Sequence, residues 1–131
     1  MARYFHPDVL DNGPAYLRAN CDLMVLVSTY TFGDNYATVT GNVLAAVSMA
    51  PTDFTLADGA SNSRTMTSAS GKQDTAADDG GGGASMHIAF LDTVNSKVLG
   101  VTEETSDQTI TAGNPVLFPQ ITVAVGQPVV L

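Results

Sequence analysis

The stretch that decides the fold is MHIAFLDTVNSKVLGVT, residues 86–102. Two runs rich in apolar and β-branched residues, 86–92 and 97–102, flank the short connection TVNS, and this arrangement predicts a β-hairpin. Because side chains alternate between the two faces of a strand, we expect Ile88 to face the core and His87 to point away from it. The sequence on both sides of this hairpin predicts further short strands.

Upstream of the hairpin, the sequence predicts a central strand and leaves one segment open. Residues 23–31 (LMVLVSTYT) form a continuous apolar run that fades into β-branched and aromatic residues, which is typical of a central strand. Residues 33–35 (GDN) predict a turn, and 36–40 (YATVT) predict another strand. The segment 42–49 has apolar spacing that fits a helical turn and β-branched content that fits a strand, so both remain open.

Other strands are predicted from alternation and from turn residues. Polar and apolar residues alternate over 53–58 and 64–70, which predicts two half-buried strands, each with one wet face. Strands are also predicted at 108–111 and 116–125, and Pro119 marks a bulge or an edge position in the last one.

The start of the chain predicts one short helix. Pro7 suits the first turn of a helix that ends near Asn20, but Gly13 and Pro14 interrupt the pattern, so two turns separated by a break remain an alternative. With roughly seven to nine short strands after this helix, we predict a mainly β fold: an antiparallel β-sandwich or a jelly-roll-like barrel with a short N-terminal helix. The length of 131 residues predicts a single domain, 1–131.

The composition favours a subunit that is docked on other protein. The chain has fifteen Thr but only five Lys plus Arg, and 14% of its residues are charged, against about 25% in an ordinary domain. Thr favours half-buried pleated surfaces, and a sparse set of charges of mostly one sign is a poor way to keep a monomer soluble. The net charge of −8 opposes binding to nucleic acid, which needs clustered Lys and Arg.

No segment predicts a membrane span or a signal peptide. No apolar run approaches the roughly eighteen residues that a membrane helix needs, and residues 1–7 (MARYFHP) lack the apolar segment of a signal peptide. We therefore expect synthesis in the cytoplasm without secretion, and no membrane partner.

Residues capable of catalysis are few and scattered. The only histidines, His6 and His87, fall in different predicted elements. A triad of His87, Asp92 and a serine can be drawn, but no Gly-x-Ser-x-Gly elbow marks a nucleophile. Cys21 cannot form an internal disulfide, and we expect a small buried hydrophobe beside Leu23. We predict no catalytic residue and no enzymatic activity.

The acidic residues beside the tract 78–83 (DDGGGG) are the one candidate for a metal site. Asp74, Asp78 and Asp79 lie next to glycines that could offer carbonyl oxygens to calcium. Their spacing does not match an EF-hand loop, so we expect solvated acids on a flexible surface loop that joins two strands. Zinc needs clustered Cys and His, which the chain lacks, and we predict no metal and no cofactor.

Both ends of the chain carry apolar residues that could contact a partner. Tyr4 and Phe5 precede the predicted helix and could either pack back on it or insert into a neighbour. At the other end the chain closes on PVVL. We predict docking arms at 1–6 and 126–131, with these partner-binding residues: Tyr4, Phe5, Pro128, Val129, Val130 and Leu131.

Several of these segments also resemble a known family. YFHPDVLDNG (4–13) and its spacing to LMVLVS (23–28) resemble the start of small virion structural proteins of tailed bacteriophages. HIAFLD (87–92), the dipeptide VT (101–102) and TITAGN (109–114) resemble the second half of the same proteins. The resemblance brings no catalytic residues with it.

The resemblance implies a β-rich cement or decoration protein of the phage head. Such a protein binds the outer surface of the major capsid protein lattice, stabilises the head and self-associates as a homo-oligomer on the virion exterior. A neck-, tail- or fibre-associated virion protein is an alternative that the same features would suit. A carbohydrate-binding module for host attachment ranks third, because the chain has no Trp.

Overall fold

A computed structural model describes residues 4–5, 13–59, 64–77, 80–81, 86–103 and 109–125 of the chain. Its elements in chain order are β1 (Tyr4–Phe5), α2 (Pro14–Asn20), β2 (Leu23–Val27), α3 (Tyr36–Gly41), β3 (Val43–Ser48), the 3₁₀ turn η1 (Pro51–Asp53), β4 (Phe54–Asp58), β5 (Arg64–Ser68), β6 (Gln73–Thr75), β7 (Gly80–Gly81), β8 (His87–Asp92), β9 (Lys97–Glu103), β10 (Thr109–Ile110), β11 (Pro115–Leu117) and β12 (Thr122–Val125). The strand pairs among these residues are antiparallel. The predicted mainly β, antiparallel fold is confirmed.

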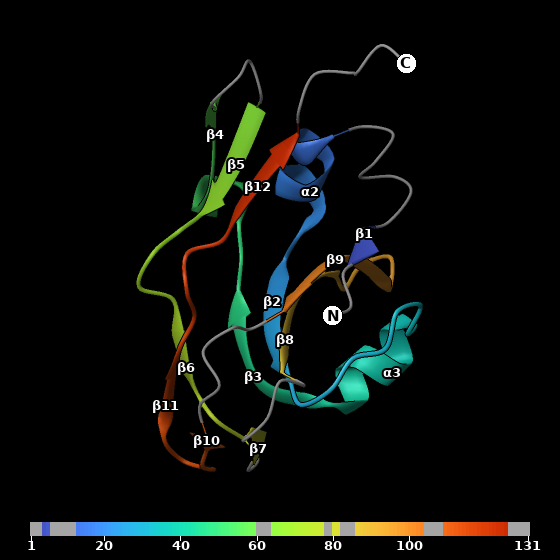
Figure 1. Cartoon of the computed structure of the whole chain (residues 1–131), viewed down its shortest axis with the longest axis vertical. Coiled ribbons are helices and arrows are strands. Elements are labelled where there is room, and N and C mark those ends of the chain that lie inside the picture. Colours follow the sequence, from blue (N-terminus) through green and yellow to red (C-terminus); the bar gives the residue numbers. More distant parts are fainter. Residues whose placement is uncertain are drawn as a thin grey trace.

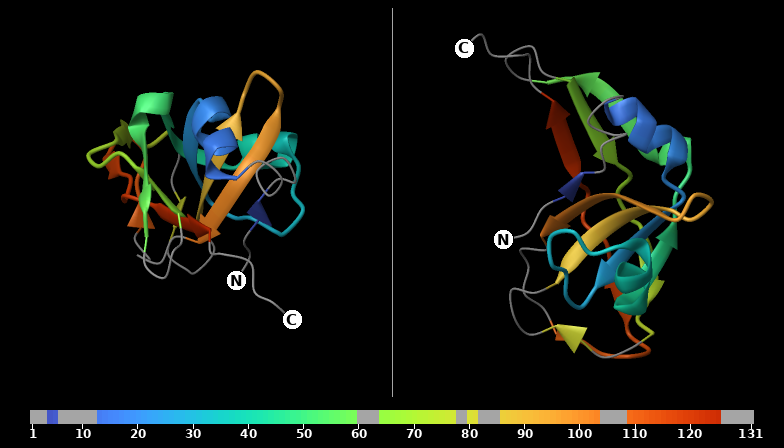
Figure 2. Two further views of the ribbon diagram at one scale, coloured as in Figure 1. Left: turned by 90° about the horizontal axis from the view of Figure 1, so that it is seen from above. Right: turned by 90° about the vertical axis from the view of Figure 1, so that its right-hand side faces the viewer.

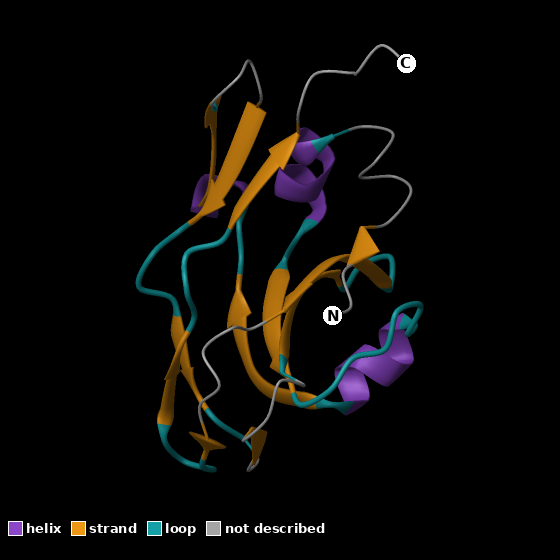
Figure 3. Cartoon of the chain, in the orientation of Figure 1, coloured by secondary structure: helices purple, strands orange, loops and turns teal. Residues whose placement is uncertain are grey.

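The strands form two layers in a sandwich-like arrangement (Figures 1 and 3). The first layer is a five-stranded sheet with the order β1-β9-β8-β2-β3, and the predicted hairpin is its β8–β9 pair. The second layer consists of the three-stranded sheet β12-β5-β4 and the two-stranded sheet β11-β6. The two-residue strands β7 and β10 pair with each other, so Gly80 and Gly81 of the predicted loop form a strand.

The second layer contains one long ribbon that is kinked in the middle. β5 and β6 run beside β12 and β11, and the pairing is offset by one residue between the two halves. Across the kink, the Ser68 amide donates to the Ile121 carbonyl at 2.8 Å, and the Phe118 amide donates to the Lys72 carbonyl at 2.8 Å. The extra residue lies between β5 and β6, where Gly71 has a φ of 77°. The predicted strand 116–125 is divided near Pro119 into β11 and β12, and the extra residue lies on the opposite side of the ribbon.

Each face of the five-stranded sheet packs against a different hydrophobic cluster. Met24 of β2 and Phe90 of β8 belong to the main core between the two layers, which α2 also covers through Leu17. Val25 and Leu91, their chain neighbours, belong to a second cluster on the other face. Burial on both faces explains why β2 and β8 are apolar at nearly every position.

The second cluster corrects the prediction for His87. All six residues of β8 are buried, and His87 is only 4% exposed. Its ring lies 5.6 Å from the ring of Tyr30, a member of the second cluster. His87 does point to the face opposite Ile88, but the prediction that only one face is core was wrong, because this second face is covered as well.

The segment 36–40 is also corrected, from a strand to the helix α3. Asn35 caps this helix: its side-chain oxygen accepts from the Thr38 amide at 2.9 Å. The Thr40 hydroxyl donates to the Tyr36 carbonyl at 3.0 Å, and Val39 is buried in the second cluster. The cap and this burial override the β propensity of the threonines. The open segment 42–49 forms the strand β3, which pairs with β2.

The helix near the start of the chain begins at Pro14, its first position, after Gly13 at φ 73°. Asn20 ends it, and its side-chain amide donates to the Tyr16 carbonyl at 2.9 Å. The predicted first turn at Pro7 lies outside the described residues. Over the described ranges, neither helix has the length and apolar character that a membrane crossing requires.

Candidate interaction surfaces

The predicted partner-binding residues lie at the margin of the described structure. Tyr4 and Phe5 form β1, and their backbone pairs with Val101 and Gly100 of β9 at one edge of the five-stranded sheet. Pro128, Val129, Val130 and Leu131 lie outside the described residues. The docking arms stay a prediction.

The groups that could be combined into a catalytic triad are not brought together. His87 and Asp92 are the first and last residues of β8, which separates their Cα atoms by about 16 Å. Asp92 is 2% exposed, and one carboxylate oxygen accepts from the amides of Val94 and Asn95, each at 3.1 Å. The Asn95 side chain donates to the other oxygen at 2.8 Å. Asp92 therefore holds the β8–β9 turn.

The structure also does not group the acidic residues considered for calcium within its described ranges. The Asp74 carboxylate accepts from the Ala46 amide at 3.0 Å and so joins β6 to the edge of β3. Asp78 and Asp79 lie outside the described residues. Within the described ranges, no three His, Cys, Asp or Glu side chains are grouped closely enough to hold a metal ion.

Cys21 is the small buried hydrophobe that the sequence predicted. It is 2% exposed within the main core, and its Sγ donates to the Leu23 carbonyl at 3.5 Å. Burial raises the pKa of the thiol to about 12. The thiol is therefore protonated, and unreactive as a nucleophile, near neutral pH.

One surface stands out on the second layer, and we call it the threonine face. It consists of the outward side chains of β4, β5 and β12, which register places in two rows: Thr55–Thr67–Thr122 and Ala57–Thr65–Ala124. The Thr67 and Thr122 hydroxyls lie 3.2 Å apart, and the Thr65 hydroxyl donates to the Ala57 carbonyl. The opposite side of the same sheet carries Phe54, Met66 and Val123 of the main core. The predicted half-buried strands with wet faces at 53–58 and 64–70 are confirmed.

The outward sides of β6 and β11 continue this surface past the kink. They carry Gln73 and Thr75 on β6, with Pro115 and Leu117 on β11, opposite the inward Asp74 and Val116. Leu117 is 62% exposed. None of these ten outward residues is charged, although the chain carries a net charge of −8. Sequence alternation indicated the wet faces, but only the register aligns their threonines into rows.

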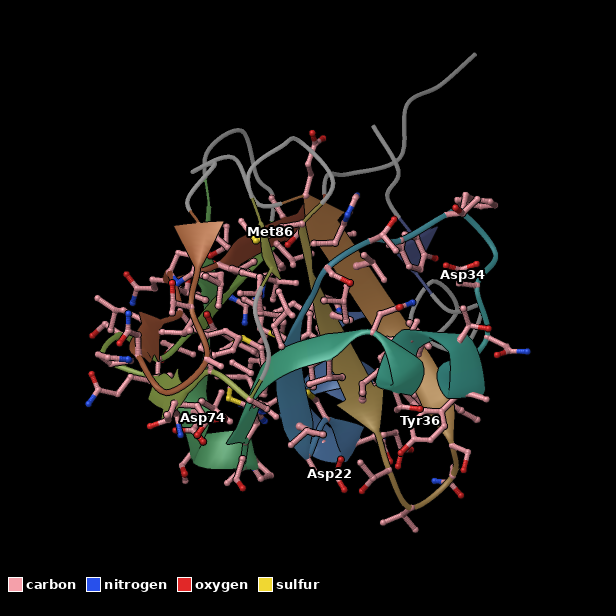
Figure 4. All side chains as sticks on the ribbon, turned by 90° about the horizontal axis from the view of Figure 1, so that it is seen from below. Asp22, Asp34, Tyr36, Asp74 and Met86 are labelled. Carbon is pink, nitrogen blue, oxygen red and sulfur yellow. The ribbon has the colours of Figure 1, made fainter. Side chains whose placement is uncertain are left out.

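A second feature, which we call the turn pocket, lies on the other side of the molecule. It has a volume of about 260 Å³ and is lined by residues 33–36, before and at the start of α3, and by 96–98, at the end of the β8–β9 turn. Figure 4 shows Asp34 on the loop before α3 and Tyr36 on α3, across the molecule from Asp74. This pocket has no signal in the sequence, because its walls come from segments that are distant in the chain.

No family model matches this chain, and the searches found neither a similar curated protein nor a similar solved structure.

Proposed function

We propose that this protein is a cement or decoration protein, which binds the outer surface of the major capsid protein lattice of a tailed bacteriophage and stabilises the head. The observation that carries the proposal is the threonine face, an exposed sheet surface without a single charged side chain on an acidic chain. Such a surface can be buried against another protein without removing a charge from water, which is the largest cost of polar burial.

The threonine face is smaller than a complete interface, so other segments would have to contribute to binding. A specific interface uses about 20 to 30 residues on each partner, and the threonine face with its continuation on β6 and β11 supplies ten. The predicted arms 1–6 and 126–131 would supply further contacts, and Tyr4 and Phe5 of the first arm already pair with β9 through their backbone. Many copies, each bound weakly across a boundary between capsid subunits, would together resist the outward pressure of packaged DNA.

Two carboxylates, those of Asp22 and Asp34, are consistent with an orientation in which the face looks toward the shell. Asp22, which bonds Thr93 of the β8–β9 turn, and Asp34, on the loop before α3, lie away from the threonine face (Figure 4). The Asp58–Arg64 ion pair, at 2.7 Å, lies at the end of the β4–β5 pair on its inward side. A neutral docking face and an acidic outer side would also limit adhesion to released nucleic acid.

A matched pair of lysine substitutions tests the face. Thr67→Lys places a long charged side chain in the middle of the row Thr55–Thr67–Thr122 of the threonine face. Thr38→Lys makes the same change at an exposed position of α3. We expect Thr67→Lys to weaken binding to capsids that lack the protein by at least about tenfold, and Thr38→Lys to bind as the unmodified chain does. Equal binding by Thr67→Lys would remove the face from the interface.

Copy number distinguishes the head from the alternative, a neck-, tail- or fibre-associated virion protein. Only the capsid lattice offers hundreds of equivalent sites, so quantitative mass spectrometry of purified particles should find hundreds of copies. Six or twelve copies per particle would favour a neck or tail position and contradict the cement proposal.

A further inference from the structure

We propose that the turn pocket binds a single neutral sugar ring. This binding site is independent of the threonine face, since α3 and the β8–β9 turn lie on the opposite side of the five-stranded sheet (Figures 1 and 2). If the threonine face docks on a capsid, the pocket faces outward, away from the shell. This outward orientation rests on the proposed function, whereas the binding of a sugar does not.

Both walls of the pocket are fixed before any ligand arrives. The β8–β9 turn is held by Asp92 and also by Asp22, whose carboxylate accepts from the amide of Thr93 at 3.0 Å and from its hydroxyl. The opposite wall is held by Asp34, which accepts from the Thr31 amide at 2.9 Å, and by the Asn35 cap. Because the walls are already fixed, the protein loses little conformational entropy when a small ligand binds.

The polar atoms of the pocket suit a ligand rich in hydroxyl groups. Among the described residues, the second Asp34 oxygen, the Asn35 side-chain NH₂ and the Ser96 hydroxyl remain for a ligand after the contacts above. They provide an acceptor, a donor and a group that does both. Neighbouring hydroxyls of a sugar ring present the same mixture.

The rest of the lining disfavours an anionic ligand. The Lys97 ammonium donates to the Tyr16 hydroxyl at 3.2 Å and lies 5.8 Å from the centre of the Tyr16 ring, so this cation is engaged with α2. An anion would therefore meet the Asp34 carboxylate without a dedicated cation. Tyr36 and Val98 supply apolar surface for the C–H face of a ring, and both also pack in the second cluster. The volume of about 260 Å³ is below the range of about 300 to 1,000 Å³ for drug-sized ligands, which fits one ring.

Ser96 supports the same conclusion from the backbone. Its φ is 54°, and it is the one non-glycine residue with a positive φ in the described ranges. Glycine would adopt this conformation without strain. Ser96 lines the pocket, and strained residues concentrate at functional sites.

The binding test is a titration of the ¹⁵N-labelled full chain, followed by NMR, with the methyl α-glycosides of glucose, galactose, mannose and N-acetylglucosamine. We expect at least one glycoside to shift the amide signals of 33–36 and 96–98 in a saturable way. Glycerol and sodium phosphate serve as ring-free and anionic probes, and we expect neither to do so. The proposal is overturned if no glycoside saturates these shifts, or if phosphate shifts them as strongly.

Two variants test the assigned groups. Asp34→Asn keeps an oxygen for the Thr31 amide but removes the charge, and we expect it to weaken glycoside binding about threefold to tenfold. Ser96→Gly removes the hydroxyl and relieves the positive φ. We expect it to weaken binding about fivefold and to raise the melting temperature by about 2 to 5 °C.

Ser70→Gly is the matched control, since it deletes an exposed serine hydroxyl on the kinked ribbon, outside the pocket. We expect this control to leave glycoside affinity unchanged. If Ser96→Gly binds as tightly as the unmodified chain, or loses binding only together with stability, the hydroxyl is not a ligand contact and the assignment of the pocket fails.

Discussion

The two sides of the five-stranded sheet differ in what covers them. On one side, the kinked ribbon and β4 close over the main core and turn small uncharged side chains outward. On the other side, α3 and the loop before it cover a smaller cluster and form the turn pocket with the β8–β9 turn. One apolar strand pair, β2 and β8, thus supports two cores, while the surfaces above them differ in chemistry: one carries uncharged side chains, and the other forms a polar pocket.

The largest expected effect compares the two clusters on one strand. Phe90 and Leu91 are neighbours in β8, both 0% exposed, and they contact opposite clusters. We expect Phe90→Ala to lower the free energy of unfolding by about 4 kcal/mol and Leu91→Ala by about 3 kcal/mol, because each leaves a cavity. Urea denaturation followed by circular dichroism measures both. A cost below about 1 kcal/mol for Leu91→Ala would mean that the helix side is not a packed core.

The next effect depends on pH and belongs to the main core. Desolvation by burial raises the pKa of Cys21 to about 12, whereas an unfolded thiol ionises at about 8.5. Between these values the unfolded chain loses a proton that the folded chain keeps. Stability therefore falls as the pH rises through this window, by up to about 1.4 kcal/mol per pH unit.

Replacing the thiol tests this sign. Cys21→Ala has no proton to lose, so we expect its stability to fall less than that of the unmodified chain when the pH is raised from about 8 to about 10. Urea titrations of both proteins at the two pH values give the loss of unfolding free energy in each. An equal loss in the two proteins would contradict the burial of Cys21 as an uncharged group.

The smallest effects compare the two surfaces. Asn35→Ala removes the cap of α3, and we expect it to cost about 1 kcal/mol of unfolding free energy. Thr67→Ala removes an exposed hydroxyl contact on the threonine face, and we expect a change within about 0.5 kcal/mol. Thermal denaturation measures both. A Thr67→Ala cost that exceeds that of Asn35→Ala would show that the threonine rows are needed for folding rather than for docking.

The sequence predicted those parts of the fold that depend on local pattern. The β8–β9 hairpin and the strand β2 follow from apolar and β-branched runs and from turn residues, and the half-buried strands β4 and β5 follow from alternation. The helix α3 was missed because its threonines favour a strand, and the cap at Asn35 decides between the two only with Val39 buried against the sheet. The burial of His87 was missed because the cover on the second face includes Tyr30, which lies on the loop before that helix.

The candidate sites depend on contacts that local pattern does not contain. The rows of the threonine face require the register of β12 on β5, which joins residues 122–125 to 64–67. The turn pocket requires Asp34 to approach Ser96, and the positive φ of Ser96 has no sequence signal, since glycine is the usual residue there. Composition pointed to exposed threonines, but their arrangement required the fold.

Cryo-electron microscopy of the parent virion tests the central claim, that the threonine face is the docking surface, most directly. The account predicts hundreds of copies on the outside of the shell, each with β4, β5 and β12 against the major capsid protein and with α3 facing solvent. Copies that contact the shell through α3 and the β8–β9 turn, or a ring of six or twelve copies at the neck, would contradict it.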